Sequence, residues 1–182
     1  MYTEFNRERV IEHLKENMRG GRSLVVVDPY FLCKGKKQNI EEYIEELDKV
    51  IGEFSKILIF THTKKFGKDQ EIKKEEYKKD EEKIINFFNR NKEVKIVKTY
   101  KLHDRLWIKD GVDYYIVGSS FNGIGLSFGF IFKFVEMSIH EEINEYLQKK
   151  IEKNTNLSKV EKEINLEFIR EILEIKNKNW WS

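Results

Sequence analysis

A chain of 182 residues can bury one sizeable hydrophobic core, so a single domain is expected. Aromatic residues make up 13% of it, which excludes a disordered chain, and no apolar run reaches the ~20 residues of a membrane span. The formal net charge of +2 is too small for a global nucleic-acid footprint, so any phosphate site must be local. The single cysteine, Cys33, cannot form an internal disulfide and the first residues show no signal pattern, so a cytoplasmic protein is expected.

The first hundred residues alternate between helix-type and strand-type apolar patterns. Apolar residues three to four apart predict helices over 4–18, 38–53 and 69–91. Short runs rich in β-branched residues predict strands over 23–28, 56–61 and 93–100. This order of elements is typical of parallel strands joined by crossover helices.

The pattern changes in the second half of the chain. Two strand-type runs, 102–109 and 114–117, flank Asp110-Gly111, a dipeptide typical of a tight hairpin turn. A last strand is predicted over 130–135. The sequence therefore predicts an α/β fold with a mixed sheet flanked by helices.

Two capping-box patterns predict the last helices. Ser138 and Glu141 would begin a helix that ends near residue 153, and Ser158 and Glu161 would begin the next one. The second helix carries an apolar stripe of Val160, Ile164, Phe168 and Ile172. We interpret residues 1–154 as the α/β domain and residues 155–182 as a C-terminal helical extension.

The strongest chemical signal surrounds the predicted hairpin. His103 and Arg105 are two apart on a predicted strand and so point to the same side. The returning strand ends near Ser120 and Asn122, which would lie beside them. An imidazole, a guanidinium, a hydroxyl and an amide suit the nonbridging oxygens of a phosphate. No carboxylate or cysteine cluster suited to a metal accompanies them, so metal-free chemistry is expected.

These residues resemble the phospholipase D superfamily, which carries His-x-Lys-x4-Asp followed by Gly-Ser-x-Asn. The first part is matched by His103-x-Arg105-x4-Asp110, with arginine in place of lysine. The second part is matched by Ser120-x-Asn122. Arginine keeps the positive charge and binds phosphate well, but the change departs from the family's catalytic pattern.

Two subgroups share more of the layout. The phospholipase-D-like C-terminal domain of MIT-domain proteins is similar in Asp28-Pro29-Tyr30 after the first strand and in His103-Asp104-Arg105. Those domains are regarded as lipid-binding. Bacterial phospholipase-D-like proteins with a His-Asp-Arg motif are similar in a Ser-x-Asn-Gly-x-Gly stretch, here residues 120–125. Several of these proteins occur in phage-defence settings.

The resemblance implies a metal-independent phosphodiesterase without a cofactor. Such a site uses two histidines, one that attacks phosphorus and one that protonates the leaving oxygen. A chain with a single motif can supply both as a homodimer with the two His103 side chains at its axis. Arg105, Ser120 and Asn122 would hold the phosphoryl oxygens. We expect a nuclease, with antiviral defence as its setting.

Four further residues are candidates for phosphate binding, namely Asp28, Tyr30, Lys101 and Asp110. The first two follow a parallel strand, at the edge where α/β proteins bind ligands. Lys101 ends a run with Lys92, Lys95 and Lys98 that could steer a polyanion. Plainer interpretations stay open: the Asp-Pro pair ends a strand, Asp110-Gly111 forms only a turn, and the lysines are solvated.

Two other functions also stay open. The first is a degenerate module that binds a phosphate of nucleic acid or of a phospholipid headgroup without turnover; the arginine substitution and the near-neutral charge favour it. The second is an interaction subunit that docks a larger partner protein through the apolar stripe of the C-terminal helix.

Overall fold

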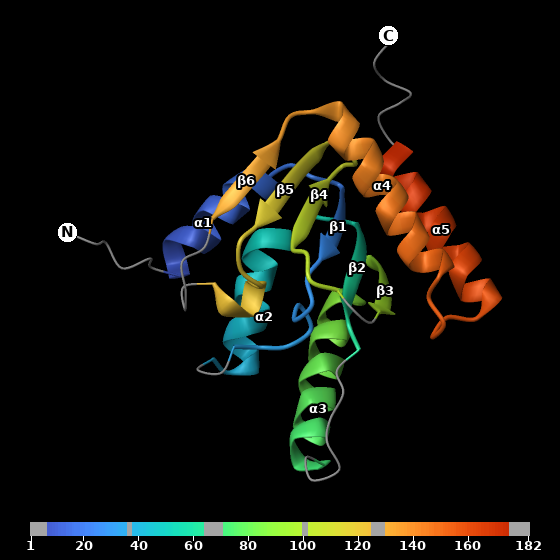
Figure 1. Ribbon diagram of the computed structural model, residues 1–182. Helices are drawn as coiled ribbons and strands as arrows, with labels where there is room; N and C mark the ends of the chain where they lie inside the picture. The colour runs from blue at the N-terminus through green and yellow to red at the C-terminus, as the bar shows by residue number, and fades with distance from the viewer. Residues whose placement is uncertain (1–6, 36–37, 64–70, 100–101, 125–129, 175–182) are drawn as a thin grey trace.

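Six strands form one mixed sheet with helices on both faces in the computed structural model, which describes residues 7–35, 38–63, 71–99, 102–124 and 130–174 (Figure 1). The strands are β1 Ser23–Val27, β2 Lys56–His62, β3 Glu93–Thr99, β4 Leu106–Lys109, β5 Asp113–Val117 and β6 Ile131–Phe134. Their order is β3-β2-β1-β4-β5-β6. The predicted α/β class and the mixed sheet are thus confirmed.

The sheet has a parallel half and an antiparallel half that meet at β1. Parallel pairing joins β1 to β2 and β2 to β3, whereas β4, β5 and β6 follow with antiparallel pairing. Val27, the last residue of β1, pairs with Phe60 on one side and with Leu106 on the other. The chain ends of β1 and β2 therefore lie at the same edge as the start of β4.

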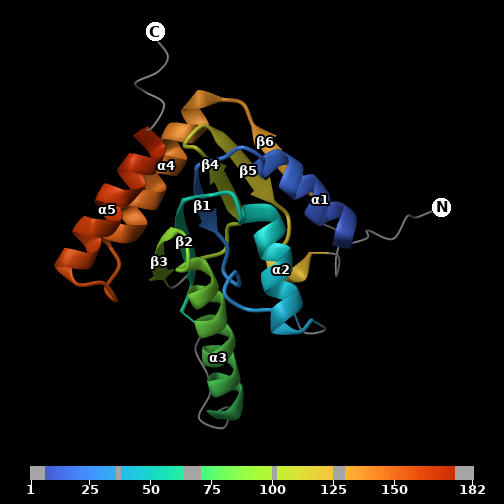
Figure 2. The same ribbon diagram turned by 180° about the vertical axis from the view of Figure 1, so that it is seen from behind.

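Helices cover the two faces unequally. α1 Arg7–Met18, α2 Ile40–Ile51 and α3 Glu71–Phe88 contribute buried side chains to one face, which Figure 2 shows from behind. α4 Met137–Glu152 and α5 Lys159–Glu174 cover the other face. Successive apolar side chains of β1 and β2 point to opposite faces of the sheet, so each strand supplies side chains to both cores.

The core under α1, α2 and α3 is rich in aromatic rings. Phe31 meets the edges of the rings of Trp107 and Phe121 at centroid distances of 5.7 and 6.1 Å. The Tyr43 hydroxyl donates to the backbone oxygen of Phe31 at 2.6 Å and so has a partner in the interior. This cluster packs the segment after β1 against the turn after β5, the two places from which the candidate site is built.

The opposite core includes the last helix. Phe168, Ile169 and Ile172 on α5 are almost fully buried with residues of β1 and β2. Val160 and Ile164, at the start of the same predicted stripe, stay exposed. The boundary predicted at residue 154 thus falls between two helices that share one core.

Asp110 and Gly111 form the predicted hairpin turn between β4 and β5. Their φ angles are 52° and 68°, both in the left-handed region, and the Val112 N–H donates to the Lys109 oxygen at 3.1 Å across the turn. A side chain at Gly111 would also meet the backbone of α5, because an added Cβ would lie 2.7 Å from the Ile172 oxygen. Glycine is therefore required here for both conformation and space.

Two local predictions were wrong and one was confirmed. The strand predicted from 102 begins only at Leu106, since β1 ends opposite that residue. The helix predicted to begin at Ser138 has Glu136 at its N-cap, and no side chain caps it. At α5 the capping box is present: the Glu161 N–H donates to the Ser158 hydroxyl at 3.2 Å, and the Ser158 N–H donates to the Glu161 carboxylate at 2.8 Å.

The helices in the described part of the chain are too short or too polar to cross a bilayer.

Candidate functional site

The candidate site lies at the sheet edge where β1 and β5 end and β4 begins. Arg105 immediately precedes β4, and Ser120 follows β5 by three residues. The Arg105 Nε donates a hydrogen bond to the Ser120 Oγ at 2.8 Å. Ser120 itself is buried. The structure therefore brings together two of the four residues that the sequence selected for phosphate chemistry.

Asp28 stands behind this pair. Its carboxylate accepts hydrogen bonds from the N–H groups of Tyr30 and Phe121, at 2.9 and 2.7 Å. Burial raises the pKa of the Asp28 carboxyl above its ordinary value, while these two N–H groups, the Ser120 hydroxyl and the charge of Arg105 act in the opposite direction. Asp28 thus links the end of β1 to the turn after β5.

This placement gives Asp28 an organising role. The hydroxyl of Ser120 accepts from Arg105 and is left with a proton to donate toward the carboxylate, so one polar chain runs from the interior to the guanidinium. Only Nε of Arg105 is used in this contact. The two terminal nitrogens of the guanidinium are the pair that can grip an anion in a bidentate manner.

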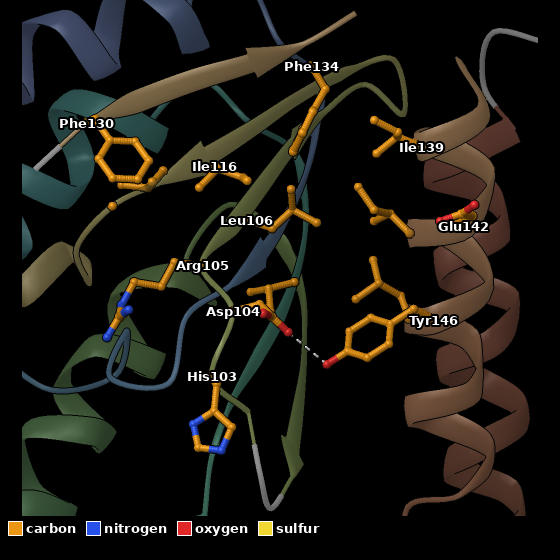
Figure 3. Close-up of a pocket in the computed structure, with 15 residues that line it drawn as sticks. His103, Asp104, Arg105, Leu106, Ile116, Phe130, Phe134, Ile139, Glu142 and Tyr146 are labelled. Atoms are coloured by element: carbon orange, nitrogen blue, oxygen red, sulfur yellow. Dashed lines mark hydrogen bonds between the residues drawn. The ribbon is translucent and has the colours of Figure 1, made fainter. Parts of the chain in front are cut away.

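His103 is exposed, and no described residue holds its imidazole through a hydrogen bond. In Figure 3, Asp104 points toward α4, whereas Arg105 points away from that helix and His103 lies toward the end of the sheet. Asp104 accepts a hydrogen bond from the hydroxyl of Tyr146 on α4, at 3.1 Å. Desolvation and the nearby Asp104 raise the pKa of Tyr146 to about 12.

A pocket of about 540 Å³ lies between this edge of the sheet and α4. His103, Asp104 and Arg105 form its polar rim, and most of the remaining wall is apolar, as the side chains of Leu106, Ile116, Phe134 and Ile139 show in Figure 3. The guanidinium of Arg105 is directed away from the apolar wall. An anion at Arg105 would therefore sit at the rim of this pocket and not in its interior.

Asn122 and Tyr30 take other positions. Asn122 lies in the short 3₁₀ turn Phe121–Gly123 and lines a separate pocket with Arg7 and Glu46, which form an ion pair at 2.6 Å. The Tyr30 side chain is 45% exposed, and its backbone N–H binds Asp28. The structure does not bring Asn122 into the pocket that His103 and Arg105 line.

Asp110 lies at the opposite end of β4 from Arg105. Its carboxylate accepts hydrogen bonds from the N–H groups of Arg22 and Ser23, at 2.8 and 2.9 Å, and so holds the start of β1. The four residues of β4 lie between Arg105 and Asp110, so five steps of ~3.3 Å separate the two by roughly 17 Å. The structure thus gives Asp110 an architectural contact and does not bring it to Arg105.

The lysines that lead toward the motif are used within the fold. Lys92 donates to the backbone oxygens of Gly52 and Phe54, Lys95 lies over the ring of Phe168, and Lys98 pairs with Glu81. Lys101 lies outside the described residues. The three described lysines of this run thus each have a partner within the fold.

One feature of this edge was not expected from the sequence, and a second was suggested there only by a histidine at the end of a strand. The Asp104–Tyr146 hydrogen bond ties the motif to α4, and only the tertiary fold brings these residues together. His62 ends β2, where its Nε2 and the neighbouring Thr63 Oγ1 are buried without a hydrogen-bond partner among the described residues. The strand-end position of His62 was the only sequence signal for it.

No protein-family model matches this chain, and no curated protein sequence matches it either. The description of the site therefore rests on its own geometry. The fold and the site define an α/β protein with a six-stranded mixed sheet that carries an arginine, a serine and a buried aspartate at one edge.

Proposed function

We propose that this protein is a metal-independent phosphodiesterase of the phospholipase-D-like type that cleaves nucleic acid. The observation that carries the proposal is the 2.8 Å hydrogen bond from Arg105 Nε to Ser120 Oγ, with Asp28 behind it and the exposed His103 two residues away. This arrangement leaves the terminal nitrogens of the guanidinium for a phosphate, and His103 and Arg105 both line the pocket of about 540 Å³. Among the described residues, no group of three or more His, Cys, Asp or Glu side chains could hold a metal ion.

The proposed reaction uses two copies of His103. A nitrogen of one imidazole attacks phosphorus and forms an N–P bond, while the bond from phosphorus to the leaving oxygen breaks. The partner subunit's His103 donates a proton to that oxygen. Water then attacks phosphorus, the N–P bond breaks, and the partner subunit's His103 accepts the proton of the water. Arg105 stays protonated throughout and stabilises the charge on the phosphoryl oxygens.

A homodimer is part of this proposal. Its support is that His103 is exposed, so that a second copy can approach it, and that the motif occurs once in the chain. A cytoplasmic location and a role in antiviral defence belong to the same proposal and rest on the sequence alone.

The test compares wild type with His103→Ala on single-stranded DNA and RNA in excess EDTA. We expect wild type to cleave at least one of them, and His103→Ala to lose roughly 10³-fold or more in rate. His13→Ala, an exposed histidine on α1, is the matched control and should keep full activity. The native mass measured by light scattering should be about twice the chain mass of 22.0 kDa.

Three outcomes would contradict parts of the proposal. Full activity of His103→Ala would remove the phosphohistidine route. Recovery of activity only on addition of Mg²⁺ would replace the metal-free chemistry. A monomer that cleaves phosphodiesters would remove the shared site.

A second candidate function is a phosphate-binding module without turnover. It is favoured by the lack of a described hydrogen-bond partner for the His103 imidazole, since catalytic histidines are commonly oriented by a third group. In that case Arg105→Ala would abolish binding of a phosphate ligand, of nucleic acid or of a phospholipid headgroup, and His103→Ala would change it little.

A further inference from the structure

A second pocket, of about 390 Å³, lies beside the candidate site where β3 and α4 end. Lys149 and Lys150 from the last turn of α4 and Lys153 at its C-cap line it with Tyr146 and with the buried Thr99. The described residues that line it include no carboxylate. The pocket beside Asn122, in contrast, is lined by three glutamates and two cations.

This lysine pocket is adjacent to the candidate site. Tyr146 lines both the lysine pocket and the pocket rimmed by His103 and Arg105. The same tyrosine donates its hydroxyl proton to Asp104, and Lys150 Nζ lies 5.0 Å from the centre of its ring. An anionic chain that left the Arg105 site along α4 would therefore meet the lysines next.

Hydrogen bonds connect the segments that form the wall of the lysine pocket. The Asn154 side chain is buried, donates to the Lys98 backbone oxygen at 2.9 Å and accepts from the Asn156 N–H at 2.9 Å. Thr99 accepts at its backbone oxygen from the Thr63 N–H at 3.1 Å. The end of β3 and the end of α4 are thus tied together around the cavity.

Unsatisfied polar groups lie next to this wall. His62 is the pairing partner of Thr99, so their side chains occupy neighbouring positions on the same face of the sheet. The His62 Nε2 and the Thr63 Oγ1 are both buried without a hydrogen-bond partner among the described residues. Neither residue is among those that line the pocket, so these atoms adjoin its wall and do not form it.

Helix stability alone does not account for the arrangement. Lysines in a last helical turn complement the negative end of the helix dipole, and that effect contributes here. It does not require that three lysines border one cavity. Glu145 pairs with Lys149 at 2.9 Å through two exposed side chains, and an exposed pair of this kind contributes little to stability.

We propose that this lysine pocket is a phosphate-binding subsite that holds the backbone of a single nucleic-acid strand next to the Arg105 site. The inference rests on the proposed function and narrows its substrate to a polymer with successive phosphates. A lone phospholipid headgroup would engage Arg105 and would leave the lysine pocket unused. Lysines serve as point charges for successive phosphates, without base specificity.

The test is oligonucleotide binding by a triple variant, Lys149→Ala/Lys150→Ala/Lys153→Ala. A fluorescent single-stranded 15-mer is titrated in EDTA at several salt concentrations, in the His103→Ala background to prevent cleavage. The variant should bind about tenfold or more weakly at 0.1 M salt, and its salt slope should be shallower by about 2, because each lost phosphate contact on a single strand contributes ~0.7.

The matched control removes the same charge from the opposite face of the sheet. Arg9→Ala/Lys15→Ala/Arg19→Ala lies on and just after α1, and should leave both the affinity and the salt slope near those of the parent. Hydrolysis of bis(4-nitrophenyl) phosphate, a substrate too small to reach the lysines, is measured for both triple variants with His103 restored. It should be unchanged.

The outcomes separate this inference from the proposed function. Oligonucleotide affinity equal in both triple variants overturns the subsite, even where the small substrate is cleaved. Absence of hydrolysis, with a specific loss of oligonucleotide affinity in the lysine variant, overturns the enzyme and supports the subsite. Lysine-dependent binding to vesicles containing phosphatidylserine, without oligonucleotide binding, assigns the surface to a membrane and overturns the inference.

Discussion

The two ends of β4 each carry an aspartate that accepts two backbone N–H groups, yet they differ in what lies beyond the carboxylate. Asp28, near the start of β4, is fully buried, and its carboxylate is connected through the Ser120 hydroxyl to Arg105. Asp110, at the other end, is half-buried and holds only the start of β1 and its own turn. Similar backbone contacts thus support the candidate site at one end of β4 and strand assembly at the other.

The difference shows how a site can be separated from a scaffold in this fold. A carboxylate that holds backbone and also leads to an accessible cation can organise ligand chemistry. A carboxylate that holds backbone alone contributes stability. The following predictions test this distinction, from the largest expected effect to the smallest.

Arg105→Ala should produce the largest functional loss. Removing one preorganised charged donor commonly lowers kcat by ~10²–10³-fold. Arg105→Lys should recover part of it, because lysine keeps the charge but not the bidentate geometry. The control is Arg22→Ala, an exposed arginine at the other end of the sheet, which should leave kcat/KM for the oligonucleotide unchanged. An equal loss in both variants would remove the distinction between the two ends.

Asp28→Asn should have the largest effect on stability. In the wild type the N–H groups of Tyr30 and Phe121 each donate to one oxygen of the Asp28 carboxylate. In the variant an amide nitrogen replaces one of these oxygens, so one buried N–H loses its acceptor, at a cost of about 2–3 kcal/mol. Urea unfolding at neutral pH measures the loss. A cost below that of Asp110→Asn would contradict the burial argument.

The same variant should change the pH dependence of stability. Because the folded pKa of Asp28 is raised, the native state binds more protons than the unfolded state between 3.8 and the folded pKa. The contribution of Asp28 to the free energy of unfolding therefore falls as pH rises through that window and is constant above it. Asp28→Asn should remove this component of the slope, and Asp110→Asn should retain it.

Gly111→Ala, in the turn between β4 and β5, should lower the free energy of unfolding by about 2 kcal/mol, the middle of the range for one strained backbone position. The added Cβ would lie 2.7 Å from the Ile172 oxygen and 2.8 Å from the Leu173 Cα, at a φ of 68°. Activity per folded molecule should not change. Gly123→Ala, in the turn after β5, is the control: nothing lies within 4 Å of its added Cβ, so urea unfolding should show less than about 0.5 kcal/mol of change.

Asp110→Asn should have the smallest effect, about 1 kcal/mol by urea unfolding, since Asp110 is half-buried and water can replace it at the exposed Arg22 N–H. It should leave phosphodiester cleavage unchanged. A large loss of cleavage with intact stability would return Asp110 to the phosphate site.

Most of the element order was predictable because apolar spacing is a local property. The hairpin turn followed from Asp110-Gly111, and the capping box of α5 followed from Ser158 and Glu161. The start of β4 was not predictable in this way. Residues 102–105 have strand-like composition, but β1 ends opposite Leu106 and offers them no partner. Strand limits depend on where the neighbouring strand ends, which a local pattern does not contain.

The candidate site was predictable only in part for the same reason. Sequence spacing selected Arg105 and Ser120, which do meet. It did not assign Asp28 a link to the turn after β5, since that contact joins residues 93 apart in the chain. It also favoured the lysines of β3 over those of α4. Only the fold shows that the former are engaged with Glu81 and Phe168 and that the latter border a cavity.

Because β1 lies in the middle of the sheet, one of its edges has no partner during an early part of synthesis on the ribosome. Val25 pairs with Leu58 on one side, but its other neighbour, Ile108, belongs to a strand that is made much later. Synthesis adds ~5–20 residues per second, so this edge of the very apolar strand stays unpaired for on the order of ten seconds before β4 is made. α5, which seals the face above it, is made later still. We expect the nascent chain to engage a chaperone in this interval, and the release of that chaperone to follow the synthesis of α5.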